Sequence, residues 1–315
     1  RLADKLPDDE SSDMARRQRV RRFLSNRFLS PGLFVRVFVA LLRPLVKDAA
    51  ELILVMDRTE WLRRGQPVNV LDVALYYRGR ALPLNWLVLN RSGNSSLEQW
   101  KQVLTPVIEA LRAASWTQGK EIDVAADREF ASPKLSEWLM STFRVGSTLR
   151  MKRSEYITQA FESQKVSHHL ESLCPGERRF LRDCTITQTN LFRMNVALYW
   201  EKGYEEPWVL MTTHTSFPET IQTYEQRFGV EPMHKDWKTN AFDLEGTRVT
   251  QAKRIETLLI PIALCYHLCV LEGTRKENAG ETIRAHKEKR TTGLLLVGLS
   301  ALTRVLRATS LARIQ

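Results

Sequence analysis

Glu51-Leu-Ile-Leu-Val-Met-Asp57 is a run of five apolar residues between two carboxylates. An uninterrupted apolar run of this length is typical of a strand that is buried within a sheet. Two further β-rich runs follow at residues 68–77 and 81–89, and Arg78-Gly79-Arg80 separates them. Because a short break that contains glycine is typical of a hairpin, we expect three antiparallel strands here.

The next elements alternate between helix and strand. Ser95 or Ser96, with Glu98 after it, is a typical helix start, and apolar residues then recur at helical spacing. Glu121-Ile-Asp-Val-Ala-Ala-Asp127 is a second apolar run that ends in an acid, and Ser132-Pro133 opens a short helix. We therefore expect a helix at residues 95–115, a strand at 121–127, a helix at 132–141 and a strand at 143–149. This order of elements is that of a ribonuclease-H-like core: three strands, then a helix, a strand, a helix and a strand.

Other segments flank or interrupt this core. Residues 14–29 predict a basic helix, either solvated or in contact with DNA, and residues 33–48 predict an amphipathic helix with Val37 on its inner face. Residues 151–210 lose the helical spacing, which returns at Glu219. We predict an α/β protein: a ribonuclease-H-like core, with a mixed sheet and flanking helices, interrupted by a mostly β insertion and preceded by a helical DNA-binding segment. We expect the N-terminal segment at residues 1–48, the first part of the core at 49–150 and the insertion at 151–215. The second part of the core is expected at 216–275 and a basic helical tail at 276–315.

The charge balance favours an acidic partner. Lys and Arg outnumber Asp and Glu by 47 to 36 in 315 residues, a net charge of +11. Nucleic acid is the first expectation for such a chain and a membrane surface the second. Residues 1–25 are polar and show no signal peptide, and the absence of a starting Met leads us to expect that part of the natural amino terminus is missing. The apolar run 258–271 contains His267 and predicts a buried helix, too short to cross a bilayer.

Four cysteines give little support for a metal site. Cys265 and Cys269 lie one helical turn apart in the apolar run and are expected in the core. Cys174 and Cys184 are separated by nine residues, whereas zinc sites usually space paired cysteines by two to four residues. A reduced cytoplasmic protein fits this pattern better.

A second informative segment is Tyr224-Glu-Gln-Arg-Phe-Gly-Val-Glu-Pro-Met-His-Lys-Asp-Trp-Lys238. On a helix at about 100° per residue, Tyr224, Arg227, Glu231 and Lys238 fall within roughly a 60° stripe. The carboxylate suits a hard cation, and the other three groups suit phosphate. The alternative is a solvated polar face, but neighbouring Phe, Val, Met and Trp residues favour a packed helix. Pro232 predicts a kink or a new helix start.

The two acids that end apolar strands point to metal chemistry. A single Asp at a strand end usually caps a turn, but in a ribonuclease-H-like sheet strands one and four are neighbours, so Asp57 and Asp127 would meet at one edge. Glu231 could complete the cluster from a later helix. Three adjacent carboxylates repel each other unless cations neutralise them, and two hard metal ions about 4 Å apart would do so. Asp236, Asp243 and Glu245 compete with Glu231 for the third place, but Asp236 is turned away from the stripe and the other two lie in a turn.

These motifs resemble the DDE transposases of bacterial insertion sequences, in the insertion-sequence-four family. That family carries Tyr, two residues, Arg, three residues, Glu, six residues and Lys, and Tyr224, Arg227, Glu231 and Lys238 match all positions and gaps. The segment His234–Thr239 is similar to the hairpin-forming branch. The resemblance covers residues 15–275 and implies a catalytic, metal-binding triad of Asp57, Asp127 and Glu231, with two Mg2+ ions that Mn2+ could replace.

The resemblance also implies roles outside the triad. Tyr224, Arg227, Lys235 and Lys238 resemble contacts to the phosphates of the transposon end, and three cations at the entry to the insertion could hold the DNA backbone: Arg150, Lys152 and Arg153. Trp208 resembles the Trp on which a flipped base stacks during hairpin formation, and a buried structural Trp is the equal alternative.

The resulting hypothesis is a cut-and-paste transposase that works as a homodimer on paired ends of double-stranded DNA and on a target DNA. A membrane is not among the expected partners. Two alternatives stay open. One is another ribonuclease-H-like nuclease, such as a hybrid ribonuclease or a junction resolvase. The other is a domesticated DNA-binding protein that has lost catalysis.

Overall fold

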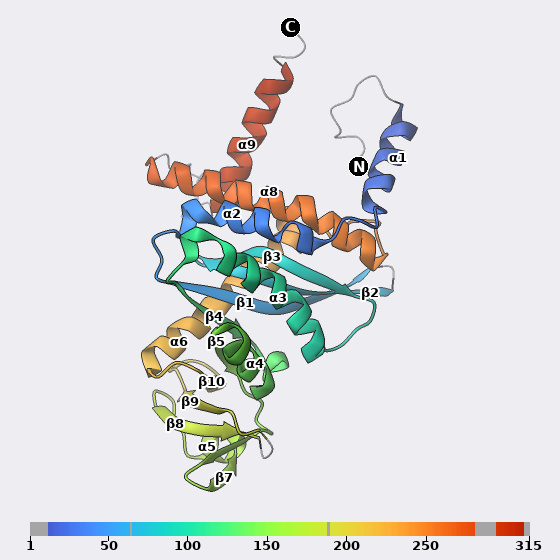
Figure 1. Cartoon of the computed structure of the whole chain (residues 1–315). Coiled ribbons are helices and arrows are strands. Elements are labelled where there is room, and N and C mark those ends of the chain that lie inside the picture. Colours follow the sequence, from blue (N-terminus) through green and yellow to red (C-terminus); the bar gives the residue numbers. More distant parts are fainter. Residues whose placement is uncertain (1–11, 64, 188–189, 281–293, 312–315) are drawn as a thin grey trace.

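The computed structural model describes residues 12–63, 65–187, 190–280 and 294–311. The predicted N-terminal segment and C-terminal tail therefore extend beyond these ranges, at residues 1–11, 281–293 and 312–315. The described strands form one ten-stranded sheet in the order β3-β2-β1-β4-β5-β10-β9-β8-β6-β7. Helices pack around its first half, and its second half forms the β-rich lower part of the molecule (Figure 1).

The first half of the sheet follows the predicted order. β1 (Glu51–Arg63), β2 (Gln66–Tyr77) and β3 (Arg80–Leu89) are antiparallel, and β4 (Glu121–Ala126) and β5 (Gly146–Arg150) run parallel to β1. The hairpin between β2 and β3 turns at Arg78 and Gly79, whose φ angles of 47° and 76° are typical of a tight two-residue turn. This topology is compatible with the ribonuclease-H-like core that the sequence predicts.

The sequence predicted that the first strand ends at Asp57, but β1 continues to Arg63. Its pairing with β4 ends at Met56 and Ala126, whereas its pairing with β2 continues to Arg63. After Asp57, Thr59 and Trp61 are buried while Glu60 and Leu62 are more exposed, an alternation that fits a strand continuing as a two-stranded ribbon. Asp57 therefore marks the point where β1 loses one neighbour, not the end of the strand.

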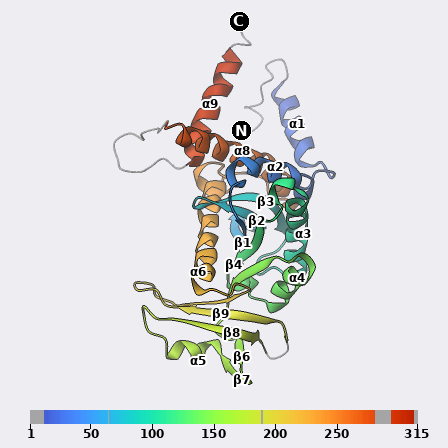
Figure 2. The same ribbon diagram turned by 60° about the vertical axis from the view of Figure 1, so that its left-hand side comes forward.

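Helices cover both faces of this half-sheet. Figure 2 shows α3 (Leu97–Ala113) and α4 (Pro133–Phe143) on one side of the strands and α6 (Phe217–Gln226) on the other. Ser96 and Gln99 form a capping box at the start of α3, so Ser96 is the cap and Gln99, not Glu98, completes it. Short 3-10 turns lie at Pro31–Leu33 (η2), Ser115–Thr117 (η3) and Arg128–Phe130 (η4).

The second half of the sheet contains β6 (Tyr156–Gln159), β7 (Glu162–Lys165), β8 (Arg178–Ile186), β9 (Arg193–Tyr199) and β10 (Trp208–Thr212), with the short helix α5 (Val166–Glu171). β10 returns to the first half and pairs antiparallel with β5 on one side and with β9 on the other. Backbone hydrogen bonds therefore join the predicted insertion to the core.

The segment that carries Tyr224 and Lys238 changes its helical form several times. α6 passes into a 3-10 turn, η5 (Arg227–Gly229), then into α7 (Val230–Lys235) and a π-helical turn, η6 (Asp236–Asn240). The capping residues between these pieces all keep right-handed helical angles, so the path stays continuous. A new helical piece does begin near Pro232, but Val230 is its first residue and Pro232 its third, whereas the proline was expected at the first position.

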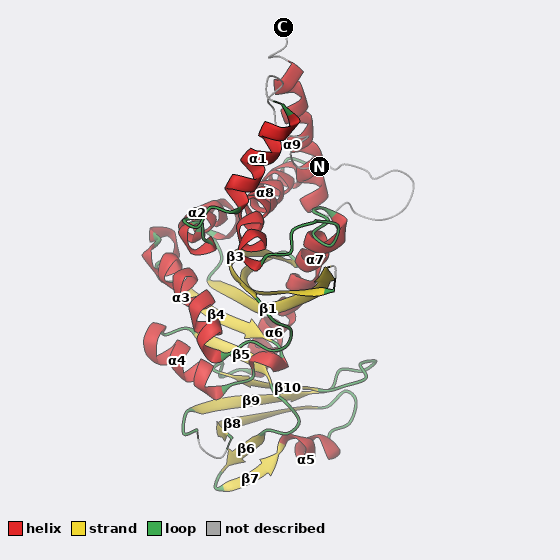
Figure 3. Ribbon diagram, turned by 90° about the vertical axis from the view of Figure 1, so that its right-hand side faces the viewer, coloured by secondary structure: helices red, strands yellow, loops and turns green. Residues whose placement is uncertain are grey.

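The remaining helices gather at the β3 end of the sheet (Figures 1 and 3). They are α1 (Asp13–Leu24), α2 (Val35–Val46), α8 (Ala252–Asn278) and α9 (Leu294–Leu311). α1 ends five residues earlier than predicted, and Val37 of α2 is exposed because the buried face is formed by Val35, Phe38, Val39, Leu42 and Val46.

α8 is longer than the apolar run that predicted it. At 27 residues it is long and apolar enough to cross a membrane by length and composition, so the prediction that it is too short is wrong. In this structure 61% of its most apolar window is buried inside the protein, as expected for a core helix. It carries Cys265 and Cys269, whose sulfur atoms lie 3.9 Å apart, and all four cysteines are free thiols.

Candidate active site

Asp57 and Asp127 lie side by side on neighbouring parallel strands. Met56 of β1 pairs with Ala126 of β4, and each of these residues is followed directly by one of the two aspartates. Residues in register on parallel strands point to the same face, so both carboxylates lie on one face. Each Oδ1 accepts the backbone N–H of the following residue, at 2.8 Å from Arg58 and 2.7 Å from Arg128.

α6 and the turns after it bring three predicted residues onto these carboxylates. The Tyr224 hydroxyl donates to Oδ1 of Asp127 at 3.5 Å. Arg227 places Nη1 3.5 Å from Oδ2 of Asp57 and Nη2 3.7 Å from Oε1 of Glu231. The guanidinium thus bridges Asp57 and Glu231, and Tyr224, one turn before Arg227, contacts Asp127.

Burial differs sharply among these groups. Tyr224 is fully buried and Arg227 is 6% exposed, whereas the Glu231 side chain is 64% exposed. Burial raises the pKa of Tyr224 to about 12, so its hydroxyl remains a donor at neutral pH. Burial alone would lower the pKa of Arg227, but Tyr224 and the nearby carboxylates raise it above its usual value. In this structure both side chains contact carboxylates, and their contact with DNA phosphates stays a prediction.

A buried histidine–aspartate pair lies behind Asp57. Asp72 of β2 is the cross-strand partner of Asp57, and its Oδ2 lies 2.7 Å from Nε2 of His234. Burial would lower the pKa of His234, but the Asp72 carboxylate raises it, which favours the imidazolium. Burial also raises the pKa of Asp57, while His234 and Arg227 act to lower it. The charge of the candidate metal ligand thus depends on this pair.

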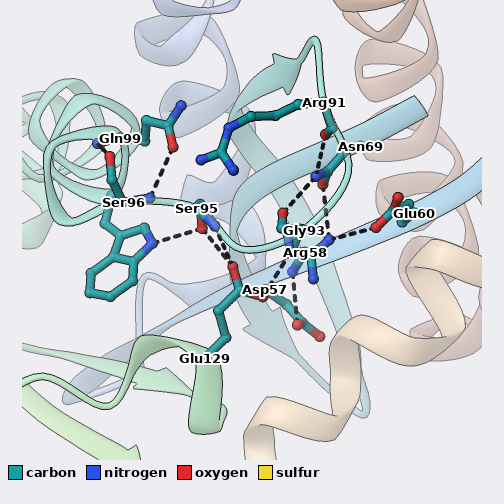
Figure 4. A network of polar contacts seen from close by, with 11 residues as sticks. Asp57, Arg58, Glu60, Asn69, Arg91, Gly93, Ser95, Ser96, Gln99 and Glu129 are labelled. Atoms are coloured by element: carbon teal, nitrogen blue, oxygen red, sulfur yellow. Dashed lines mark hydrogen bonds and ion pairs between the residues drawn. The ribbon is translucent and has the colours of Figure 1, made fainter. Parts of the chain in front are cut away.

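A second network braces the ends of the two aspartate-bearing segments (Figure 4). Arg58 donates from Nε to Oε2 of Glu129 at 2.7 Å and from Nη1 to Oε2 of Glu60 at 3.0 Å. Oε1 of Glu129 accepts from both the backbone N–H and the hydroxyl of Ser95, at 2.9 and 2.7 Å. Since Arg58 follows Asp57 and Glu129 comes two residues after Asp127, this ion pair fixes the two carboxylates relative to each other.

The other predicted cations are placed differently. Lys238 donates from Nζ to the backbone carbonyl of Glu60 at 3.2 Å, so it lies against β1 beyond Asp57. Lys235 and Lys152 are exposed. Arg150 and Arg153 both pair with Glu206, each at 3.5 Å. Glu206 also pairs with Arg128, so this acid gathers three arginines beside the site.

Trp208 lies in the core at the start of β10. It is 5% exposed, and its ring packs against four others at centroid distances between 5.0 and 6.2 Å: Tyr199, Tyr204, Tyr224 and Phe228. This environment accounts for a large aromatic residue by packing alone. Stacking on a flipped base stays a prediction.

The competing acids have other partners. Oδ2 of Asp236 forms an ion pair with Arg80 at 2.6 Å, and Asp236 is buried away from the triad. Oδ1 of Asp243 accepts the backbone N–H of Gly246 at 3.1 Å, in the turn that the sequence predicted, and Glu245 is exposed there. The geometry therefore favours Glu231 as the third acid.

Sequence reasoning missed Asp72, His234, Glu129 and Glu206 as parts of the site. Asp72 has a local signal, since an acid stands in the middle of the apolar run Val70–Ala74. Glu129 lies only two residues after Asp127. The partners of His234 and Glu206 come from distant elements, and no local pattern identifies them.

Comparison with known proteins identifies a family for most of the chain. The family model for a transposase DDE domain matches residues 48–268. A search of curated proteins gave no match. Among solved structures, an Argonaute from A. aeolicus is similar over 65% of this chain and 27% of its own, with 10% identity and a TM-score of 0.28. This chain therefore spans about a quarter of that protein. Endonuclease V from Bacillus subtilis is similar over 82% of this chain and 98% of its own, with 11% identity and a TM-score of 0.27.

Proposed function

The chain belongs to the family of transposases with a DDE domain, and from that premise we propose that it is an active cut-and-paste DNA transposase. In this proposal the protein cuts at the ends of a transposon and joins the freed 3′ ends to a target. The observation that carries the proposal is that Arg227 contacts both Asp57 and Glu231 while Tyr224 contacts Asp127. The match to the Tyr-Arg-Glu-Lys spacing of the insertion-sequence-four family supports the same reading.

The three acids fit a pair of hard divalent cations. Carboxylate oxygens are the ligands that Mg2+ and Mn2+ prefer. Burial raises the pKa of Asp57, so a cation beside it would stabilise the ionised form. Bound to Asp57, Asp127 and Glu231, two ions would activate the attacking water or 3′ hydroxyl and stabilise the leaving oxygen.

The surrounding residues position these acids and neutralise charge. Arg227 reaches both Asp57 and Glu231 and can shift its guanidinium towards a phosphate when cations take over the carboxylates. Tyr224 holds Asp127 through its hydroxyl. The exposed cations Lys235, Lys152 and Arg153 are proposed to contact the DNA backbone beside the acids.

We further propose that the protein acts as a homodimer on two paired ends, with one active site for each end, and that flanking DNA leaves through a hairpin. The hairpin proposal rests on the similarity of His234–Thr239 to the hairpin-forming branch. In this proposal residues 1–48 bind DNA, and the helices α1 and α9 stand out from the body of the molecule where a second chain or DNA can reach them (Figure 1).

The proposal is tested with a labelled transposon end and Mg2+. We expect Asp57→Asn, Asp127→Asn and Glu231→Gln each to lower strand cleavage by more than about 100-fold, since each removes a direct metal ligand. End binding in a gel-shift assay should change little, because none of the three acids is placed to contact DNA. Strand transfer from a precut end should be lost together with cleavage.

Glu245→Gln is the matched control, because Glu245 is an exposed acid in a nearby turn. It should keep activity within a few-fold of the parent. If Glu245→Gln were inactive and Glu231→Gln active, the assignment of the third acid would be wrong. If the parent bound transposon ends but never cut them, the domesticated DNA-binding alternative would hold. Cleavage of RNA–DNA hybrids or four-way junctions in preference to ends would favour the other nucleases.

A further inference from the structure

A second group of metal-ligating side chains lies at the other end of the same strands. Glu51 begins β1, Asp123 lies within β4, and His214 follows β10 just before α6. One ligand atom from each of the three lies within 4.8 Å of the others. Nε2 of His214 is 3.3 Å from Oδ2 of Asp123 and 3.9 Å from Oε1 of Glu51. Asp123 lies four residues before Asp127, about 13 Å away at the rise of a strand.

The Asp123 carboxylate is buried without adequate compensation. Its side chain is 3% exposed, and Oδ1 makes no well-formed hydrogen bond among the described residues. Thr148 and the backbone N–H of Val124 act to lower the pKa of Asp123, but burial and the charge of Glu51 raise it well above its usual value. The charges that act on Asp123 come from Glu51 and Glu121, and Glu219 and Glu121 act on His214. A buried carboxylate beside further acids is costly unless it takes up a proton or binds a cation.

The absence of a side chain at Gly146 of β5 leaves room for the Asp123 carboxylate. A Cβ atom on Gly146 of β5 would lie 2.2 Å from Oδ2 of Asp123 and 2.9 Å from the Thr213 hydroxyl. Any other residue at 146 would therefore displace Oδ2 from its position beside His214. The neighbouring strand is thus shaped to keep this oxygen beside the imidazole.

His214 is held in an orientation that suits a metal ligand. Its backbone carbonyl accepts from the Asn195 amide at 2.7 Å, and its backbone N–H donates to the Thr212 hydroxyl at 3.1 Å. Nδ1, the ring nitrogen turned away from Asp123, lies 4.0 Å from Oε2 of the exposed Glu219, which is beyond hydrogen-bond distance in this structure but within reach of a small side-chain movement. A carboxylate behind the second ring nitrogen is the usual support for a metal-bound histidine. Burial lowers the pKa of His214, which favours the neutral, ligating form.

We propose that Glu51, Asp123 and His214 bind one divalent transition-metal ion, separate from the ions of the Asp57, Asp127 and Glu231 triad. One imidazole nitrogen and two carboxylate oxygens suit Zn2+ or Mn2+. Ligands about 2.1 Å from a tetrahedral ion lie about 3.4 Å apart, close to the observed 3.3 and 3.9 Å. The ion would replace the contact of Nε2 with the Thr223 hydroxyl, now 3.1 Å.

The site would tie the start of α6 to β1 and β4. α6 packs along these strands, with His214 before its first turn and Tyr224 near its last. An ion at the first end would therefore fix the helix that presents Tyr224 and Arg227 to the triad at the other end. The ion has a positioning role in this proposal and takes no part in strand cleavage.

The test measures metal binding without DNA, in a protein that carries Asp57→Asn, Asp127→Asn and Glu231→Gln to silence the triad. Equilibrium dialysis against Zn2+, and separately against Mn2+, should give about one tightly bound ion per chain. Adding His214→Gln or Glu51→Gln should weaken that binding by more than about 100-fold, beyond the usual cost of losing a supporting residue. Glu51 is partly exposed, so its variant keeps the core intact.

Glu256→Gln serves as the matched control, because Glu256 is a similarly shielded acid on α8, outside both groups. It should bind the ion like the triad-silenced parent. Zn2+ should also raise the Tm of that parent and leave the Tm of the His214→Gln protein unchanged. The proposal is overturned if the silenced parent binds neither ion, or if the His214 and Glu51 variants bind as tightly as Glu256→Gln. Because this assay uses no DNA, its outcome is independent of whether the protein cuts transposon ends.

Discussion

His234 and Asp72 show how a side chain without a direct role in chemistry can set the charge of one that has it. Asp72 lies opposite Asp57 on the neighbouring strand, and His234 reaches Asp72 from α7. The imidazolium acts to lower the pKa of Asp57, and the Asp72 carboxylate acts to raise it. His234 is therefore a positioning residue whose charge helps to keep Asp57 ionised.

His234→Gln should move the acidic limb of the pH–rate profile for end cleavage to higher pH. The substitution removes the positive charge that lowers the pKa of Asp57. At a given pH a smaller fraction of Asp57 is then ionised, so metal binding and cleavage are lost earlier as the pH falls. Cleavage rates at saturating Mg2+ across pH 5–9 measure the shift. Lys235→Gln, which removes an exposed charge one residue away, should leave the limb in place. An unmoved limb in His234→Gln would show that the pair serves folding alone.

At the scale of elements, the ion pair between Arg58 and Glu129 joins β1 to the turn η4. Both side chains are well shielded, at 16% and 13% exposed, so solvent screens the pair only weakly. Glu129 also accepts two hydrogen bonds from Ser95, immediately before the cap of α3. Three elements are therefore held together next to the metal-binding acids.

Glu129→Gln should lower cleavage by about 10- to 100-fold, the usual effect of losing a partner that orients metal ligands. The amide would set a donor against Arg58 and leave a shielded guanidinium without its strongest partner, which costs about 1–3 kcal/mol of folding stability. Cleavage rates and urea unfolding measure the two effects. Glu60→Gln removes the other, more exposed partner of Arg58 and is the control, with a small effect on both. Equal effects of the two variants would contradict the special role of Glu129.

The elements could be predicted where their signals are local. The runs at residues 51–57, 68–77 and 81–89 are rich in apolar residues, turn residues bound the last two, and all three are strands. The extension of β1 beyond Asp57 depends on pairing with β2, and the capping partner Gln99 depends on geometry, so both were missed. Asp57, Asp127 and Glu231 could be proposed from their order and spacing, and their role as metal ligands stays a prediction. The pairs of Asp72 with His234 and of Arg58 with Glu129 depend on contacts between distant segments.

At the scale of the whole molecule, the chain has an excess of 11 positive charges, and its basic side chains differ in whether they can reach DNA. Several arginines are already paired with acids, as Arg150 is with Glu206. Lys152 and Arg153 lie beside the site and are exposed, whereas Lys101 lies on α3, across the sheet from α6 (Figure 2). Only cations on the DNA-facing side should contribute to the salt dependence of binding.

Binding to a transposon end should weaken steeply with salt, with a slope of about −0.9 in log K for each phosphate neutralised. Lys152→Gln with Arg153→Gln should reduce the magnitude of the slope by about 2, since two phosphate contacts are lost. Gel-shift titrations from 50 to 300 mM salt, roughly the range in which such slopes are measured, provide the values. Lys101→Gln is the control and should keep the parent slope. A flat response of the parent would exclude nucleic acid as the main partner.

The position of β10 limits which residues of the insertion can be deleted or replaced. β10 gives β5 its second neighbour, and the far edge of the sheet is the short, polar β7. Removing residues 151–213 would strip β5 of that neighbour and expose its unpaired backbone groups to other chains, which invites aggregation. Segments of other size could replace β6 to β9 during evolution or in engineering, provided that a strand returns in the place of β10.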